Sequence, residues 1–240
     1  MSAVIPVISQ RELEEVFPHP PLREVAFEIR FAPRLRVAAE LWRLQDQLVS
    51  QYPQSSTEAM LRPNGTTFEV NVFQNPISGR VIKISQQNFA IVFTKYSRFE
   101  DFKEEVSEKV SQFWQTFSID TVTRVGLRYV NHILLNDTDR SALLKYVRPM
   151  LDFDRVPIRS IRHFVNEAEI ECGEHLATVR AALIPDRASL YVLDIDCHRD
   201  DQRPSAEVLQ LMDAFHDTAQ RIFLDHVTDE YKMVMRGGTS

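Results

Sequence analysis

The chain has 240 residues, of which 44% are hydrophobic and 26% charged, so it can bury a large core without disulfides or a structural metal. Its net charge of −6 argues against nucleic acid as a partner, because binding to phosphates rests on lysine and arginine. No apolar run is long enough for a membrane span, and the first residues lack the pattern of a signal peptide. We therefore expect a cytoplasmic protein.

The first half of the sequence predicts an arm, then one strand, one helix, three strands and a long helix. Residues 1–20 form the arm, and the strict alternation of segment 24–31 predicts a strand. Apolar residues spaced three and four apart predict a helix that ends before Pro53, and the polar stretch after it predicts a loop. The further strands and the long amphipathic helix are expected at 68–73, 80–85, 89–96 and 99–117.

The second half of the sequence repeats this order. The strand, the helix, the three strands and the closing helix are expected at 121–135, 141–151, 164–173, 177–184, 188–198 and 205–227. Corresponding elements lie about 100 residues apart, which favours an internal duplication over an ordinary α+β domain.

The matching order predicts an α+β fold made of two pseudo-repeats of β-α-β-β-β-α. Together they would form one curved antiparallel sheet backed by helices, like saddle-shaped and helix-grip folds. The expected parts are an N-terminal arm, a first repeat, a second repeat and a C-terminal tail, at 1–20, 21–118, 119–228 and 229–240.

The strand at 121–135 carries the candidate binding residues. In an extended chain Arg124, Gly126, Arg128 and His132 share one face. Asn131 lies on the other face among apolar residues, where a buried amide needs hydrogen-bond partners. Gly126 weakens a strand unless something approaches its backbone. We predict that these five residues contribute to a surface that binds a protein partner or an anion.

Two arginines that flank a glycine can take an anionic group by bidentate hydrogen bonds. The alternative is that Arg124 and Arg128 pair with Glu28 or other acidic residues of the neighbouring strand. A second basic stretch, at 155–164, includes Arg159 and Arg162. We predict it as an interaction loop for phosphate or an acidic partner, with a solvated connector as the alternative.

The octapeptide RVGLRYVN, residues 124–131, and the stretch PPLREVAFEIRF, residues 20–31, resemble a sporadically distributed prokaryotic family of similar length. The resemblance covers nearly the whole chain in element order, but it is sharp only in the octapeptide. It implies a patchy, mobile distribution that suits defence systems or toxin–antitoxin modules. It lends no catalytic residues.

A set of polar residues on the strand at 188–198 could offer ligands to a divalent ion. Asp194, Asp196, His198 and Asp200 stand at alternate positions. Neighbouring Cα atoms on one side of a strand are almost 7 Å apart, which is too far for all four to close on one ion. Motifs of metalloproteases, serine hydrolases and nucleotide-binding loops are absent, and two cysteines make no metal framework. We predict no catalytic residue, no metal and no cofactor.

These observations leave three functional hypotheses. The first is a non-enzymatic protein-binding module whose open sheet face or strand edge holds a partner encoded near it, as a subunit, antitoxin or regulator of a defence or toxin–antitoxin system. The second is a sensor of a small anion or nucleotide that uses Arg124 and Arg128. The third is a metal-dependent hydrolase that uses Asp194, Asp196 and His198.

Overall fold

The computed structural model describes residues 8–13, 15–61, 65–135, 142–148, 163–184 and 190–238. Its strands are β1 (Leu22–Arg30), β2 (Gln54–Leu61), β3 (Thr67–Asn75), β4 (Arg80–Ile84), β5 (Asn88–Phe93), β6 (Thr121–Val122), β7 (Arg124–Leu134), β8 (Phe164–Cys172), β9 (His175–Leu183), β10 (Leu190–Arg199) and β11 (Arg203–Pro204). Its helices are α1 (Gln10–Leu13), α2 (Leu35–Ala39), α3 (Leu41–Leu48), α4 (Phe99–Phe117), α5 (Ala142–Tyr146), the 3-10 helix η2 (Ser205–Leu211), α6 (Met212–His226) and α7 (Asp229–Met235).

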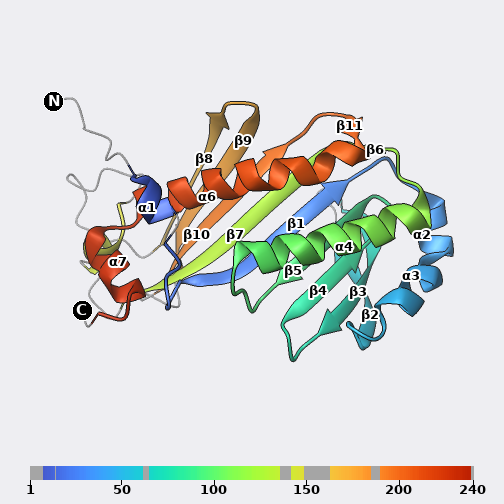
Figure 1. The fold of residues 1–240 in the computed structure, drawn as a ribbon, viewed down its shortest axis with the longest axis horizontal. Coiled ribbons are helices and arrows are strands. Elements are labelled where there is room, and N and C mark those ends of the chain that lie inside the picture. The colour runs from blue at the N-terminus through green and yellow to red at the C-terminus, as the bar shows by residue number, and fades with distance from the viewer. Residues whose placement is uncertain are drawn as a thin grey trace. The chain divides into compact units, whose positions relative to one another are not determined.

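The fold is of the predicted α+β class, a large antiparallel sheet backed by helices (Figure 1). This sheet has 9 strands in the order β2-β3-β4-β5-β1-β7-β10-β9-β8, and β11 pairs with β6 in a separate sheet of 2 strands. The two outermost strands are β2, whose neighbour is β3, and β8, whose neighbour is β9. Each of these strands therefore has one backbone edge without a neighbour among the described strands.

Two compact units divide the chain. We call residues 24–127 and 198–213 the β2 unit, after its edge strand. Residues 1–23, 128–197 and 214–240 are the β8 unit. Each unit combines segments that are far apart in the sequence.

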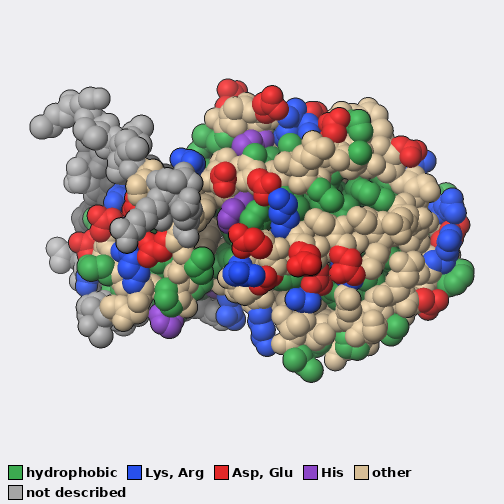
Figure 2. All heavy atoms as spheres, viewed as in Figure 1, with side chains coloured by type: hydrophobic (Ala, Val, Ile, Leu, Met, Phe, Trp, Pro, Cys, Tyr) green, Lys and Arg blue, Asp and Glu red, His purple; other side chains and the backbone are tan. Residues whose placement is uncertain are grey.

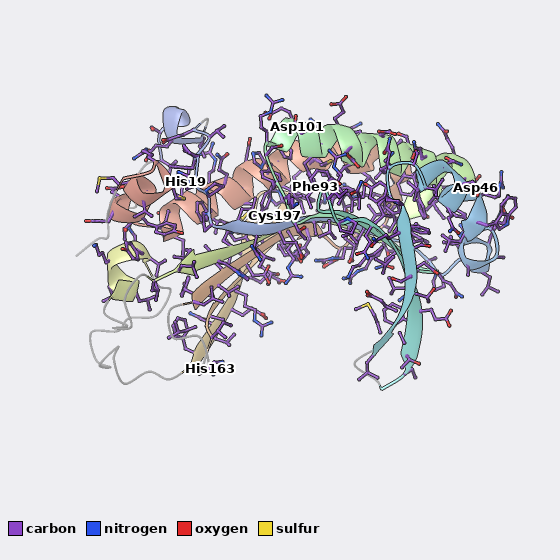
Figure 3. The ribbon with its side chains drawn as sticks, turned by 90° about the horizontal axis from the view of Figure 1, so that it is seen from below. His19, Asp46, Phe93, Asp101, His163 and Cys197 are labelled. Atoms are coloured by element: carbon purple, nitrogen blue, oxygen red, sulfur yellow. The ribbon has the colours of Figure 1, made fainter. Side chains whose placement is uncertain are left out.

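The core of the β2 unit lies between α4 and one face of its strands. Phe89 and Phe93 of β5 point towards α4, where they contact Phe113 and Phe102 with ring centroids 4.6 Å and 4.9 Å apart. Phe27, on the same face of β1, is fully buried. Figure 3 shows Phe93 between the strands and the helix. Burying each of these side chains contributes about 1.5–3 kcal/mol, which fixes this face as the inner one.

The apolar stripe predicted for the helix at 99–117 is confirmed in α4. Phe102, Val106, Val110 and Phe113 have no exposed surface. Figure 2 shows acidic and basic side chains along the outer side of this helix. The helix ends at Ser118, which adopts the left-handed conformation (φ 51°) and donates its N–H to the carbonyl of Trp114, a common way to close a helix.

The core of the β8 unit forms in the same way beneath α6. Alternate residues of β9 and β10 are buried, and these are Ala177, Val179, Ala181, Leu183, Leu193, Ile195 and Cys197. Phe215 of α6 packs against the ring of His175, at 5.0 Å between ring centroids. The strands therefore present a second apolar face that a helix covers.

The two terminal segments of the β8 unit are tied together. Lys232 of α7 forms an ion pair with Glu12 at 3.0 Å, and Arg236 forms a two-point ion pair with Glu15 at 2.6 Å. The backbone N–H of His19 donates to the carbonyl of Met235. The segment that we described from sequence as a C-terminal tail thus contains a helix that packs against the N-terminal segment.

Two predictions about the first half of the chain were wrong. The polar stretch expected to be a loop contains β2, whose residues are all exposed and so show no alternation of apolar and polar types. The helix expected before Pro53 is divided into α2 and α3, because Glu40 leaves the helical conformation (φ −112°, ψ 15°). In the second half, η2 precedes α6 where a single helix was expected.

Candidate functional site

The predicted alternation along β7 is confirmed by burial. Val125, Leu127 and Ile133 are fully buried, and Tyr129 and Asn131 on the same side are nearly so. On the other side Arg128 is exposed, whereas Arg124 and His132 are half-buried and Gly126 is buried. The amide nitrogen of Asn131 donates to the carbonyl of Leu193 at 3.3 Å, which supplies the partner that its burial requires.

Both arginines of this face are engaged by aspartates that follow or belong to β10. Within the β2 unit, Arg124 Nη1 lies 2.6 Å from Asp200 Oδ1. Within the β8 unit, Arg128 donates from Nε and Nη2 to the two carboxylate oxygens of Asp194, at 2.7 Å and 2.6 Å. Glu28, the acid that we named for this pairing, pairs with Arg30 instead. Bidentate pairing uses the donors of Arg128 that an anionic ligand would need.

Of the remaining predicted residues, the structure describes His132. The backbone N–H of His132 donates to the carbonyl of Pro21 at 2.8 Å. On the buried side of β7, the hydroxyl of Tyr129 lies 2.7 Å from Nδ1 of His216 on α6. Arg159 and Arg162 lie outside the described residues.

The polar residues of β10 also have local roles. Asp194 holds Arg128, and Nε2 of His198 lies 3.3 Å from Oδ2 of Asp200. Within the described part of the chain, no three histidine, cysteine, aspartate or glutamate side chains are placed to share a metal ion.

Two other groups that could carry chemistry are buried. Burial raises the pKa of the Cys197 thiol to about 12, so it is protonated at neutral pH and a poor nucleophile. Burial, with a smaller contribution from Arg148, lowers the pKa of His226 to about 4. His226 Nε2 lies 2.5 Å from the hydroxyl of Tyr191, and both side chains lie within the core of the β8 unit.

The feature that sequence reasoning missed is the edge strand β2. It pairs with β3 in antiparallel register over its whole length, from Gln54 opposite Gln74 to Leu61 opposite Thr67. All of its residues are exposed. In Figure 3, β2 and β3 extend away from α4 as a pair. Because β2 is the outermost strand, its second backbone edge has no neighbour among the described strands.

The hydrogen bonds of the neighbouring turns show which β2 groups face this free edge. Ser85 donates its N–H to the carbonyl of Asn88, and Thr94 donates its N–H to the carbonyl of Gly79. The odd-numbered residues of β4 therefore direct their backbone groups to β5. Backbone direction alternates along an antiparallel strand. The registers of β4 with β3 and of β3 with β2 extend this alternation to β2. One set of β2 residues therefore directs its backbone N–H and C=O groups away from β3. The outward set is Ser55, Thr57, Ala59 and Leu61.

A buried network anchors the chain where it enters β2. The hydroxyl of Tyr52 donates to Glu105 of α4 at 2.6 Å, and Arg80 pairs with the second oxygen of this carboxylate at 2.6 Å. Tyr52 is 1% exposed, and burial raises the pKa of its hydroxyl. The side-chain amide of Asn75 donates to the carbonyl of Gln51 at 2.9 Å. The edge strand therefore starts from a fixed point, which reduces the ordering that a bound segment must impose.

A pocket of about 530 Å³ lies on the inner face beside β2. Its walls come from α2, α3 and the loop before them on one side, and from β2, β3, β4 and the β4–β5 turn on the other. The lining residues are Pro33, Val37, Ala38, Leu41, Ala59, Thr67, Phe68, Glu69, Asn71, Ile84, Ser85, Gln86 and Gln87. Among these lining residues, Glu69 alone has an ionisable side chain. The pocket therefore combines apolar surface with hydrogen-bonding groups and one negative charge.

Large apolar side chains are exposed on the helices that line this pocket. Leu35 of α2, Trp42 of α3 and Val49, directly after α3, are 77%, 61% and 54% exposed and stand seven residues apart in the sequence. Figure 2 shows hydrophobic and basic side chains together at this end of the β2 unit. We call these three residues the α2–α3 stripe. A repeated exposed apolar position, and an exposed tryptophan above all, is typical of protein-binding surfaces.

The chain matches no protein-family model, and a search among curated proteins finds no match. Among the helices that the structure describes, none has the length and apolarity needed to cross a bilayer.

Proposed function

We propose that the chain is a non-enzymatic protein-binding module that takes up an extended segment of a protein partner along β2. The observation that carries this proposal is the outer edge of β2, which has no neighbour among the described strands and whose residues are all exposed. An added strand would gain backbone hydrogen bonds from the outward groups of Ser55, Thr57, Ala59 and Leu61. The pocket and the α2–α3 stripe beside this edge offer apolar contacts that could select the partner.

The biological setting is part of the same proposal. The resemblance carried by RVGLRYVN suits a subunit, antitoxin or regulator of a prokaryotic defence or toxin–antitoxin system, with a partner encoded near it. The strand order supports the proposed duplication. β1 and β7, the first strands of the two proposed repeats, are neighbours in the sheet. Outward from β1 come β5, β4 and β3, and outward from β7 come the corresponding strands β10, β9 and β8. In this comparison β2 is the additional strand. An added element at an edge is a natural place for a function of its own.

A proline placed on each edge tests the function. Thr57→Pro removes an outward N–H from β2, and proline is tolerated on edge strands where this group faces solvent. The matched position in β8 is Glu167. The N–H of Ile184 donates to the carbonyl of Leu190, so the even-numbered residues of β9 direct their backbone groups to β10 and the odd-numbered ones to β8. In the β8–β9 register, the backbone groups of Glu167 therefore point away from β9. Wild type and both variants would be tagged and purified from the native host.

We expect one stoichiometric protein to be retained by wild type and by Glu167→Pro and to be lost with Thr57→Pro. Equal thermal unfolding of the three proteins would show that the fold is intact. Retention of the same partner by Thr57→Pro would overturn the proposed function.

A further inference from the structure

We propose that the segment bound along β2 comes from a different protein and carries a lysine or arginine opposite Ala59, where Glu69 receives its charge. This inference rests on the proposed function and adds the chemistry of the partner. The argument starts from the register of β2 with β3, in which Ala59 lies directly opposite Glu69. Directly opposed residues point to the same face of a sheet. A partner residue opposite Ala59 would therefore share this face with Glu69.

The small side chain of Ala59 leaves the space between such a residue and Glu69 open. Adjacent strands lie about 4.8 Å apart, so the partner strand and β3 would be roughly 10 Å apart. A long basic side chain can lie across the methyl group of Ala59 and bring its charge to the carboxylate of Glu69. A short side chain at this partner position would leave the carboxylate uncontacted.

The charge and the lining of the pocket both favour a basic side chain. Glu69 is exposed, and none of the residues that the structure describes makes a hydrogen bond or ion pair with its carboxylate. The other lining residues that the structure describes are neutral, and Val37, Leu41 and Ile84 supply apolar surface. Lysine and arginine place their methylene stems on apolar surface and keep the charged end at a polar group. The pocket offers both kinds of surface.

A second copy of this chain does not supply the required charge from an edge strand. The residues of β2 are QSSTEAML and those of β8 are FVNEAEIEC, and neither strand contains lysine or arginine. A β2 strand paired with β2, or with β8, would therefore bring no cation to Glu69. The described edge strands of a second copy thus offer no cation to Glu69, which favours a different protein with an extended basic segment.

The experiment selects short random peptides displayed on phage against the wild-type protein, and then measures synthetic peptides of the enriched sequences by isothermal titration. We expect enriched peptides to share a lysine or arginine at one fixed position between residues of strand-forming type. Replacing this residue by norleucine in the synthetic peptide should weaken binding roughly two- to fivefold, because Glu69 is exposed and exposed ion pairs contribute little. Enrichment without a basic residue would overturn the inference.

Three variants locate the charge. Glu69→Lys replaces attraction by repulsion, and Ala59→Arg places the chain's own guanidinium opposite Glu69, so both should weaken binding roughly tenfold. The matched control is Glu104→Lys, which makes the same change of charge at an exposed position of α4, away from β2. The control should bind as wild type does. Unchanged binding to Glu69→Lys would contradict the inference.

Failure of this inference and failure of the proposed function give different results. Peptides that bind wild type, lose binding with Thr57→Pro and have no basic preference would overturn only the inferred partner chemistry. Peptides whose binding is unaffected by Thr57→Pro would overturn the edge itself. If wild type forms a dimer that Thr57→Pro dissociates, the occupant is a second copy and the inference of a different protein is wrong.

Discussion

The two edge strands of the sheet, β2 and β8, differ in the number of acidic side chains that would repel a second strand. β8 carries Glu167, Glu169 and Glu171 on one face, whereas β2 has a single acid, Glu58. Two β8 strands paired in antiparallel fashion about Ala168 would place carboxylates opposite each other, which destabilises such a pair. Charged side chains of this kind protect edges against unwanted pairing. β2 lacks such a row of acidic residues, which supports the proposal that its edge receives a partner strand.

Acidification should produce the largest difference between the units that carry these edges. The pKa of His226, in the β8 unit, is lowered by burial from 6.5 to about 4. The stability that depends on neutral His226 is fully present above pH 6.5 and is lost as the pH falls towards 4, because the unfolded chain then binds the proton first. The loss is about 3 kcal/mol in total and about 2 kcal/mol at pH 5.

Hydrogen exchange at pH 7 and pH 5, corrected for intrinsic rates, measures this difference. We expect protection to fall in the β8 unit before it falls in the β2 unit, and the difference to shrink in His226→Gln. A pH of 5 avoids the range of Glu12, whose pKa is lowered to about 2 by the Ser9 N–H and Lys232. The stability that Glu12 provides is lost only as the pH falls from 4.5 towards 2. Equal loss of protection in both units would contradict the role of His226.

Removing the protection of β8 should make the two edges more alike. The triple variant Glu167→Gln, Glu169→Gln and Glu171→Gln removes repulsion worth about 1–2 kcal/mol in a β8–β8 pair. We expect self-association to strengthen roughly tenfold, measured by sedimentation equilibrium over a range of protein concentrations.

The control for this triple variant neutralises three exposed acids elsewhere, with Asp46→Asn, Glu100→Gln and Glu104→Gln. It changes the net charge by the same amount and should leave self-association as in wild type. If both triple variants associate equally, net charge and not the protection of β8 limits pairing.

Reversing the charge of Arg128 separates the arginine face of β7 from the edge of β2. Arg128→Glu loses its two hydrogen bonds to Asp194 and places two carboxylates together. Since the arginine side chain is 49% exposed, we expect the free energy of unfolding to fall by only about 1 kcal/mol in chemical denaturation. Arg128→Gln should cost less. Partner binding at β2 should not change, and its loss in Arg128→Glu would move the site to β7.

The smallest expected effect on stability is at Trp42. Its side chain is 61% exposed, so Trp42→Ser should change the free energy of unfolding by less than about 0.5 kcal/mol. The affinity for a bound segment should fall if the α2–α3 stripe contacts it. Leu144→Ser, at an exposed position of α5 in the β8 unit, is the matched control. A large loss of thermal stability in Trp42→Ser would show that the stripe supports the core.

Sequence reasoning succeeded where one face of an element is buried and the other exposed. The core accepts mainly apolar side chains, so the buried positions of β7 and α4 are apolar. Their spacing in the sequence therefore shows which element each segment forms. It failed at β2 because both faces of that strand are exposed. No residue of β2 has to be apolar for burial, so only its backbone hydrogen bonds with β3 define the strand. Backbone hydrogen bonds can form with almost any side chain, so the sequence of β2 shows no pattern.

The candidate site could be predicted only in part for a related reason. The faces of β7 followed from alternation, but the partners of Arg124 and Arg128 are set by the strand that lies beside them. The sequence suggested β1 and Glu28, whereas the ion pairs are made with Asp200 and Asp194. Which distant segments become neighbours depends on the whole topology, and no local pattern contains it.

The discontinuity of the two units also has a consequence for the order in which the protein is made. The five strands at the β2 end of the sheet, from β2 through β3, β4 and β5 to β1, all lie within residues 22–93. They therefore leave the ribosome early. The β8 unit closes only when α7 emerges, because Lys232 and Arg236 hold Glu12 and Glu15. During synthesis, β2 can thus pair with β3 before the other edge of the sheet exists. A partner synthesised nearby could bind the nascent chain, and assembly could begin before translation ends.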